Sequence, residues 1–171
     1  MTKKMNLSEK ESYSLTWILF ENILLLLNWG IGFFLLTPFQ YHGIPIIALI
    51  YLTILIVVQI LLKKHNCGNC YYHNKRCHMG WGKISSLICK KGTGNADLGK
   101  KLSISYILQL PVITILSLLA GLVYGFKITH LILLGIFILI NIFQAAILRK
   151  TTCSECKNKK QCKFCAIKTK H

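Results

Sequence analysis

The chain has 171 residues, the length of a single domain, yet 53% of them are hydrophobic and the formal net charge is +16. The hydrophobic residues fall in long blocks, and nearly all lysines and arginines fall between those blocks. This segregation excludes an ordinary soluble basic domain and is typical of a membrane protein.

Four hydrophobic blocks are long enough to be transmembrane helices, because about 20 apolar residues cross the hydrocarbon core of a bilayer. A bilayer offers no water to satisfy backbone groups, so helices are the expected form. The first block is too long for the hydrophobic region of a signal peptide and has no small-residue cleavage site before the next polar loop, so we expect it to remain in the mature protein. The predicted spans are residues 15–36, 44–62, 102–126 and 128–148.

These spans predict an all-α integral membrane protein. Its expected parts are an N-terminal segment with the first helical hairpin (1–62), a basic cysteine-rich loop (63–101), a second hairpin (102–148) and a basic cysteine-rich tail (149–171).

Positive charge predicts the orientation of these parts. The loop contains nine lysines and arginines with Asp97 as its one acid, and the tail contains eight with Glu155 as its one acid. The connections on the opposite side contain a single lysine, Lys127, and no arginine. Short loops rich in lysine and arginine stay in the cytoplasm, so we expect a multi-pass protein of the cell membrane with both termini in the cytoplasm.

The sequences LLKKHNCGNC (61–70) and ILRKTTCSEC (147–156) follow the same pattern: a helix end, two cationic residues, a polar spacer and a Cys-x-x-Cys pair. This predicts that the two hairpins are parallel repeats related by an axis along the membrane normal. The alternative is chance recurrence, since any inner helix end favours lysine and arginine.

All eight cysteines lie in the loop and the tail, where a reducing cytosol favours metal binding or redox chemistry over structural disulfides. The tail spacing C-x2-C-x5-C-x2-C suits one four-thiolate site. The loop places its last cysteine far from the others, so His65, His73 and His78 are alternative ligands there. The predicted metal ligands are Cys67, Cys70, Cys77, Cys89, Cys153, Cys156, Cys162 and Cys165.

Zinc, as two ions, is the favoured cofactor because it folds segments too short to form a core. Iron-sulfur clusters also use four cysteines and are the alternative. The C-x2-C-x2-C run of bacterial ferredoxins is missing, and no proline follows a cysteine, which disfavours the clusters.

Glu21 is the only acid inside a predicted span, and amide side chains occur at comparable depth on all four spans. Such a layer predicts either a site for a proton or a cation, or hydrogen bonds that hold the helices together; we favour the bonds. His42 and His130 lie in or beside the turns on the side away from the cysteines, and we expect both to have surface roles. The candidate intramembrane polar site comprises Glu21, Asn22, Gln59, Gln109, Asn141 and Gln144.

The basic loop and tail favour anionic lipid head groups of the bilayer as partners, because positive-inside bias already accounts for the charge without nucleic acid. Residues 80–92, GWGKISSLICKKG, are expected to lie along the membrane interface. Residues 94–101, GNADLGKK, have the spacing of a phosphate-binding loop, but no strand precedes them and Lys101 replaces the required serine or threonine, so we interpret them as a linker.

No nucleophile and base constellation is visible, so the sequence does not favour an enzyme. The expected function is a metal-stabilised membrane scaffold or adaptor with a cytoplasmic or membrane protein partner. The alternatives are electron transfer through iron-sulfur clusters and transport of a soft metal cation past Glu21.

Overall fold

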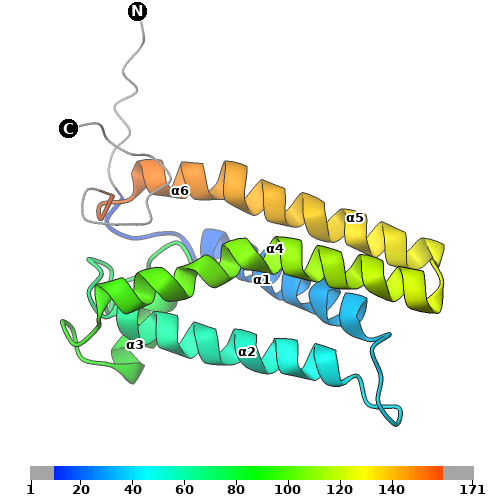
Figure 1. Ribbon diagram of the computed structural model, residues 1–171. Coiled ribbons are helices and arrows are strands. Elements are labelled where there is room, and N and C mark those ends of the chain that lie inside the picture. The colour runs from blue at the N-terminus through cyan, green and yellow to red at the C-terminus, as the bar shows by residue number, and fades with distance from the viewer. Residues whose placement is uncertain (1–9, 160–171) are drawn as a thin grey trace, which may run out of the picture.

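The computed structural model describes residues 10–159. Apart from two isolated β-bridges, all regular secondary structure in that part of the chain is helical, and four long helices lie alongside one another (Figure 1). Each of the four belongs to a stretch that is long and apolar enough to cross a membrane. The predicted all-α fold is confirmed, and the four helices indicate an integral membrane protein. They are α1 (Leu15–Leu36), α2 (Ile46–Leu62), α4 (Ala96–Tyr124) and α5 (Ile128–Phe143).

Three of these helical stretches extend beyond the predicted spans, always on the side that carries the cysteines. The α2 helix continues through a π-helical turn, η1 (Lys63–Cys67), and α5 continues through η2 (Gln144–Leu148) into α6 (Arg149–Glu155). The α4 helix begins at Ala96 because the Asn95 side chain accepts hydrogen bonds from backbone N–H groups of the first turn. The first cysteine of the loop and that of the tail therefore lie on helix ends.

The two ends of the bundle differ. At one end, which we call the turn end, residues 37–45 connect α1 to α2 and residues 125–127 connect α4 to α5. The other end, which we call the cysteine end, contains residues 10–14, residues 63–95 with the short helix α3 (Trp81–Ile88), and residues 149–159. Figure 1 shows α3 and α6 gathered at this same end.

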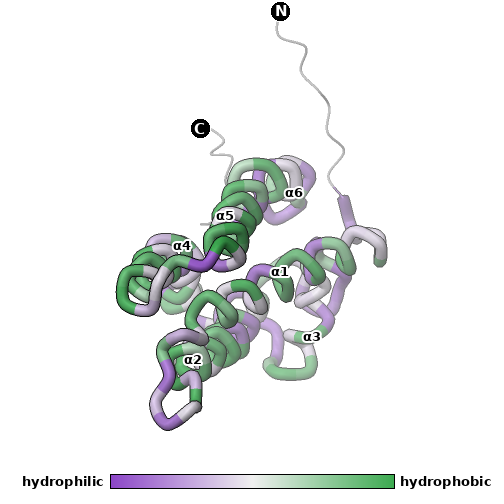
Figure 2. Tube along the Cα trace, turned by 90° about the vertical axis from the view of Figure 1, so that its right-hand side faces the viewer, coloured by the Kyte–Doolittle hydropathy of each residue, from purple (hydrophilic) through white to green (hydrophobic). Residues whose placement is uncertain are grey.

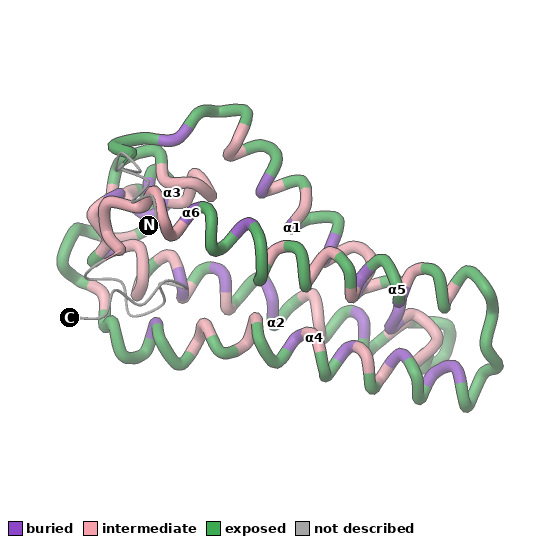
Figure 3. The backbone as a smooth tube through the Cα atoms, turned by 90° about the horizontal axis from the view of Figure 1, so that it is seen from above, coloured by how far each residue is buried: buried purple, intermediate pink, exposed green. Residues whose placement is uncertain are grey.

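The helices pack in a defined order. In the described part of the chain, α1 and α4 contact each other and both remaining long helices, whereas α2 and α5 do not contact one another. Buried positions lie on the sides that the helices turn toward each other (Figure 3). The main apolar core lies toward the turn end and consists of Leu35, Leu36, Ala48, Ile113, Leu134 and Phe137.

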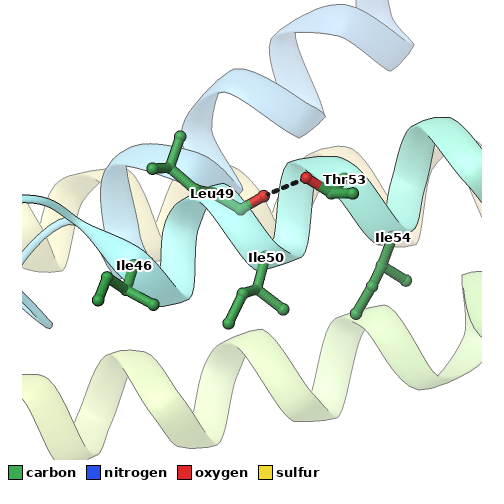
Figure 4. Close-up of a pocket in the computed structure, with 5 residues that line it drawn as sticks. All are labelled: Ile46, Leu49, Ile50, Thr53 and Ile54. Carbon is green, nitrogen blue, oxygen red and sulfur yellow. Dashed lines mark hydrogen bonds between the residues drawn. The ribbon is translucent and has the colours of Figure 1, made fainter.

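Figure 2 shows that the long helices are largely hydrophobic along their length. Many of their large apolar side chains are exposed on the outside of the bundle. A shallow groove of about 260 Å³ on α2 is lined by four aliphatic side chains and Thr53 (Figure 4). The Thr53 hydroxyl donates a hydrogen bond to the carbonyl oxygen of Leu49 at 2.9 Å, so its polar group is satisfied within the helix. Such a surface suits lipid acyl chains, because it presents no polar group that needs water.

Candidate metal centre

The N-terminal segment, residues 10–14, lies between the loop and the tail. Lys10 forms a parallel β-bridge with Cys156, and its N–H donates to the carbonyl oxygen of Glu155 at 2.9 Å. The Tyr13 N–H donates to the carbonyl oxygen of Arg76 at 3.0 Å, and its hydroxyl donates to that of Thr152 at 3.1 Å. The segment therefore joins the two cysteine-bearing regions, a role that the sequence analysis missed.

Tyr72 is the point at which the three segments meet. Its side chain is 2% exposed, and its hydroxyl donates to the carbonyl oxygen of Lys10 at 2.5 Å while accepting from the N–H of Lys157 at 3.1 Å. Burial raises the pKa of Tyr72 to about 12. The phenol is therefore protonated at neutral pH and able to make both bonds.

Tyr72→Phe is expected to lower the free energy of unfolding by about 1–2 kcal/mol, because it removes two hydrogen bonds that join the N-terminal segment and the tail to the loop. Unfolding in lipid nanodiscs, followed by helical circular dichroism, would measure the loss. The control is Tyr41→Phe at the turn end, where Tyr41 is 66% exposed. Equal stability of the two variants would contradict the role assigned to Tyr72.

Two ion pairs cross between the N-terminal segment and the tail. The Lys10 Nζ lies 2.7 Å from Glu155 Oε2, and the Lys157 Nζ lies 2.5 Å from Glu11 Oε1. The hydrogen bond from Lys157, and then its charge, lower the pKa of Glu11 below its ordinary value of 4.5. The bond with Glu11 in turn raises the pKa of Lys157 above 10.5. Because the Lys157–Glu11 pair reaches solvent, it contributes little energy and mainly fixes the register.

The Glu11–Lys157 ion pair should be lost both at low pH and at high pH. Because the pKa of the Glu11 carboxyl is lowered in the fold, the pair is stabilising above the ordinary pKa of 4.5, and this stabilisation is lost as the pH falls through the lowered pKa. Because the pKa of the Lys157 amine is raised, the pair is stabilising below the ordinary pKa of 10.5, and this stabilisation is lost as the pH rises through the raised pKa. Amide exchange of residues 10–13 should therefore be slower in the wild type than in Glu11→Gln from about pH 5 to about pH 10. The difference should disappear in acid, and a difference independent of pH would exclude this pair as its cause.

Three of the loop cysteines, Cys67, Cys70 and Cys89, lie at the end of η1. The N–H of Cys70 donates to the carbonyl oxygen of Cys67 at 3.1 Å and closes the first Cys-x-x-Cys turn. Cys89 returns to this turn after α3: its Sγ lies 3.7 Å from the carbonyl oxygen of Lys64 and would lie 3.2 Å from a Cβ added to Gly68. Cys67 interacts electrostatically with the other three loop cysteines. The cysteine that is remote in sequence is thus near the others in space.

Cys77 has a distinct environment among these thiols. Its Sγ accepts a hydrogen bond from the N–H of Gly82 at 3.4 Å. Burial raises the pKa of the Cys77 thiol, and backbone N–H groups around the sulfur oppose that effect. These N–H groups would stabilise a thiolate if a cation replaced the thiol proton.

The three loop histidines considered as alternative ligands each have a partner in the fold. His65 Nδ1 accepts from the N–H of Asn95 at 3.1 Å, and His73 Nε2 lies 3.1 Å from the carbonyl oxygen of Cys89. The third, His78, binds a carboxylate on α1, as described below. Their positions are therefore explained by hydrogen bonds within the fold.

The tail repeats the backbone pattern of the loop. The N–H of Cys156 donates to the carbonyl oxygen of Cys153 at 3.3 Å, and the next such bond runs from Lys159 to Cys156 at 3.2 Å. The loop has the equivalent bonds at 3.1 Å each. The Asn158 Nδ2 donates to the Sγ of Cys70 at 3.6 Å, so the two turns are neighbours. Cys162 and Cys165 lie outside the described residues.

The described thiols are near one another without sharing a centre. Within residues 10–159, no three His, Cys, Asp or Glu side chains are arranged to hold a metal ion. No disulfide joins any of the six cysteines in that range. Metal ligation by the eight cysteines stays a prediction.

The polar residues of α1 contact the loop. Glu21 is buried, with Oε2 at 2.6 Å from His78 Nδ1 and Oε1 accepting from Trp17 Nε1 at 2.8 Å. The Asn22 Nδ2 donates to the carbonyl oxygen of Met79 at 3.0 Å. These contacts join the first long helix to the cysteine-rich loop, and no sequence pattern indicates that His78 is the partner of Glu21.

The amides of the other helices bind side chains on neighbouring helices. Each bond joins two long helices, which is the role that the sequence analysis favoured for such residues. The bonds join Gln59 to Tyr106, Gln109 to Tyr51 at 2.7 Å, and Asn141 to Asn28 at 2.8 Å.

Two remaining polar residues lie apart from those bonds. Gln144 is half-buried at the start of η2. His130 is also half-buried, and its Nε2 lies 2.8 Å from the Ser117 Oγ, so it joins α5 to α4 in addition to lying beside a turn. The six predicted residues of the polar layer are thus distributed over separate contacts.

No protein-family model matches the chain, and comparisons with curated proteins and with solved structures give no significant match. The fold places the chain in the class of all-helical proteins with four helices able to span a membrane. Within that class, its particular features are the two neighbouring Cys-x-x-Cys turns and the N-terminal segment between them. Function must be inferred from these features.

Proposed function

We propose that the protein is a scaffold or adaptor of the cell membrane whose loop and tail each bind one zinc ion through cysteines. The observation that carries the proposal is the pair of Cys-x-x-Cys turns, which have the same backbone hydrogen bonds and lie next to each other. Turns of this spacing let two thiolates reach one tetrahedral ion.

The fit of the loop to zinc rests on its donors. Cys67 interacts electrostatically with the other three loop thiols, and Gly68 leaves room for the Sγ of Cys89 against the first turn. Binding would require the thiols to turn toward a common centre. Lys63 and Lys64, where η1 begins, would offset the negative charge that four thiolates bring to a divalent ion. For the tail, the complete donor set includes Cys162 and Cys165.

Zinc would also explain how the cysteine end is held together. Few large apolar side chains are buried there, Tyr13 and Tyr72 being the main ones, so the end depends on hydrogen bonds rather than on a core. A metal site adds folding free energy where burial cannot. A rigid basic surface beside the bilayer is what an adaptor needs in order to dock a protein partner.

The proposal places the cysteine end in the cytoplasm and treats the hairpins as parallel repeats. Positive charge at that end supports the orientation. The contacts among the four long helices support the repeat: exchanging α1 with α4 and α2 with α5 leaves the set of contacting pairs among these four helices unchanged.

The test is metal analysis together with an absorption spectrum of anaerobically purified full-length protein. We expect colourless protein with about two zinc ions per chain, falling to about one in Cys67→Ser and in Cys153→Ser. The control is Ser154→Ala, which changes a neighbour of Cys153 without removing a thiol. Brown protein with iron and sulfide would overturn the zinc proposal in favour of electron transfer, and protein without bound metal would overturn both.

The orientation has its own test. A membrane-impermeant thiol reagent applied to intact cells should leave the cysteines unlabelled, whereas the same reagent should label them in inverted membrane vesicles. Strong labelling of Cys67 or Cys153 from outside the cell would reverse the proposed orientation.

A further inference from the structure

The short helix α3 begins beside the apolar part of α1. The Asn22 Nδ2 on α1 donates to the carbonyl oxygen of Met79, and a Cβ added to Gly80 would lie 2.8 Å from the Cγ2 of Ile18. Residues 79 and 80 therefore pack against α1 inside its apolar stretch, which starts at Leu15. The loop returns to the membrane region just before α3 starts.

A second contact places the start of α3 beside the end of α2. The Nζ of Lys63 lies 5.2 Å from the centre of the Trp81 ring, a cation–π contact at the point where α2 ends. Trp81 is the first residue of α3. A tryptophan beside a lysine at a helix end is the arrangement expected at the head-group level of a bilayer.

The two faces of α3 are different. Gly82 and Ser85 are buried against the rest of the loop. Leu87 is 87% exposed, and Ile84 and Ile88 are 42% and 43% exposed. Because residues three and four apart share a helix face, these three form one apolar stripe. The stripe lies outside the four spans and has no covering element among the described residues.

Basic residues accompany this stripe. Lys83 on α3 is exposed, and so are Lys90 and Lys91 directly after it. The one acid in residues 63–101 is Asp97, in the first turn of α4. An apolar stripe with neighbouring lysines complements a surface of acyl chains under anionic head groups, and it complements a water-facing position poorly.

We infer that α3 is an in-plane membrane helix that binds anionic lipid. Leu87, Ile84 and Ile88 enter the interface between head groups and acyl chains, and the lysines bind phosphate-bearing head groups. This anchor does not depend on metal in the proposed sites. It fixes the cysteine-rich loop to the bilayer and leaves the tail side of the cysteine end for a soluble partner.

Amide exchange measured by mass spectrometry tests the inference on the full-length protein in nanodiscs. One set of discs contains phosphatidylcholine alone, and the other contains phosphatidylcholine with phosphatidylglycerol. Exchange of residues 81–88 should be slower by about tenfold in the anionic discs. Leu87→Asp should abolish that difference while exchange in α2 stays unchanged. Since Leu87 is 87% exposed, its replacement disturbs no packing.

A control variant and two possible outcomes test whether α3 binds the membrane. Ser86→Asp adds the same charge on the side of α3 that faces away from the apolar stripe, and it should behave like the wild type. Equal exchange in both kinds of disc, with no effect of Leu87→Asp, would overturn the inference by showing that α3 faces water. Protection that appears only after a soluble protein is added would overturn it in favour of a protein partner.

Discussion

Glu21→Ala is expected to lower the free energy of unfolding by about 2–4 kcal/mol and to release the cysteine-rich loop from α1. The substitution removes the hydrogen bonds to His78 and Trp17 at a site where the carboxylate is 5% exposed. The His78 side chain is 37% exposed, so water compensates part of its loss and the full cost of breaking a buried pair is not reached. The carboxylate is thus a link between membrane helix and loop.

Two further acid substitutions sharpen this prediction. Glu21→Gln keeps an acceptor for Trp17 and should lose about half as much stability. Glu11→Gln breaks an ion pair at the same end of the molecule, but the Glu11 side chain is 75% exposed, so water screens the pair and the substitution should cost much less stability than Glu21→Ala. Unfolding in nanodiscs and amide exchange of residues 76–82 would measure all three. Glu21→Ala and Glu11→Gln behaving alike would rule out a structural role for the buried pair.

Gly82→Ala is expected to displace α3 and to cost about 3 kcal/mol. A Cβ at this position would lie 2.0 Å from the carbonyl oxygen of Tyr72 and 2.5 Å from that of Lys75. Neither backbone can move freely, because the N–H of Lys75 donates to Tyr72 and the N–H of Asn74 donates to Gly82. Relief of the clash therefore breaks hydrogen bonds in the loop.

The control for Gly82→Ala is Gly135→Ala on α5. A Cβ there has no atom within 4 Å, and alanine favours a helix over glycine, so stability should be unchanged or slightly higher. Amide exchange of residues 81–88 should rise in Gly82→Ala alone. Normal exchange and normal stability in that variant would show that the loop accommodates a side chain, contrary to the close packing described here.

These predictions concern the cysteine end because three separate chain segments assemble there. The N-terminal segment, the loop and the tail meet at Tyr72, and Glu21 ties the loop to the bundle. Changes in these three segments would therefore reach the long helices through few contacts. Each contact named above is therefore a sensitive position for substitution.

The sequence by itself determined the four long apolar helices, because a bilayer requires every backbone group to be satisfied locally and long apolar runs meet that requirement only as helices. The ends were less predictable. The extension of α4 back to Ala96 depends on the cap at Asn95, and the extension of α5 into α6 carries the helix beyond the apolar block, where hydropathy gives no signal.

Only the tertiary structure decided which polar groups meet. Glu21 could be recognised as unusual from its place in a span, but its partner His78 lies in the loop, and the return of Cys89 to Cys67 depends on how α3 packs. The joining of loop and tail by residues 10–13 left no pattern in the sequence. Local periodicity and composition indicate whether a segment lies in lipid or in water. The contacts of Glu21, Cys89 and residues 10–13 depend instead on how segments that are remote along the chain pack together.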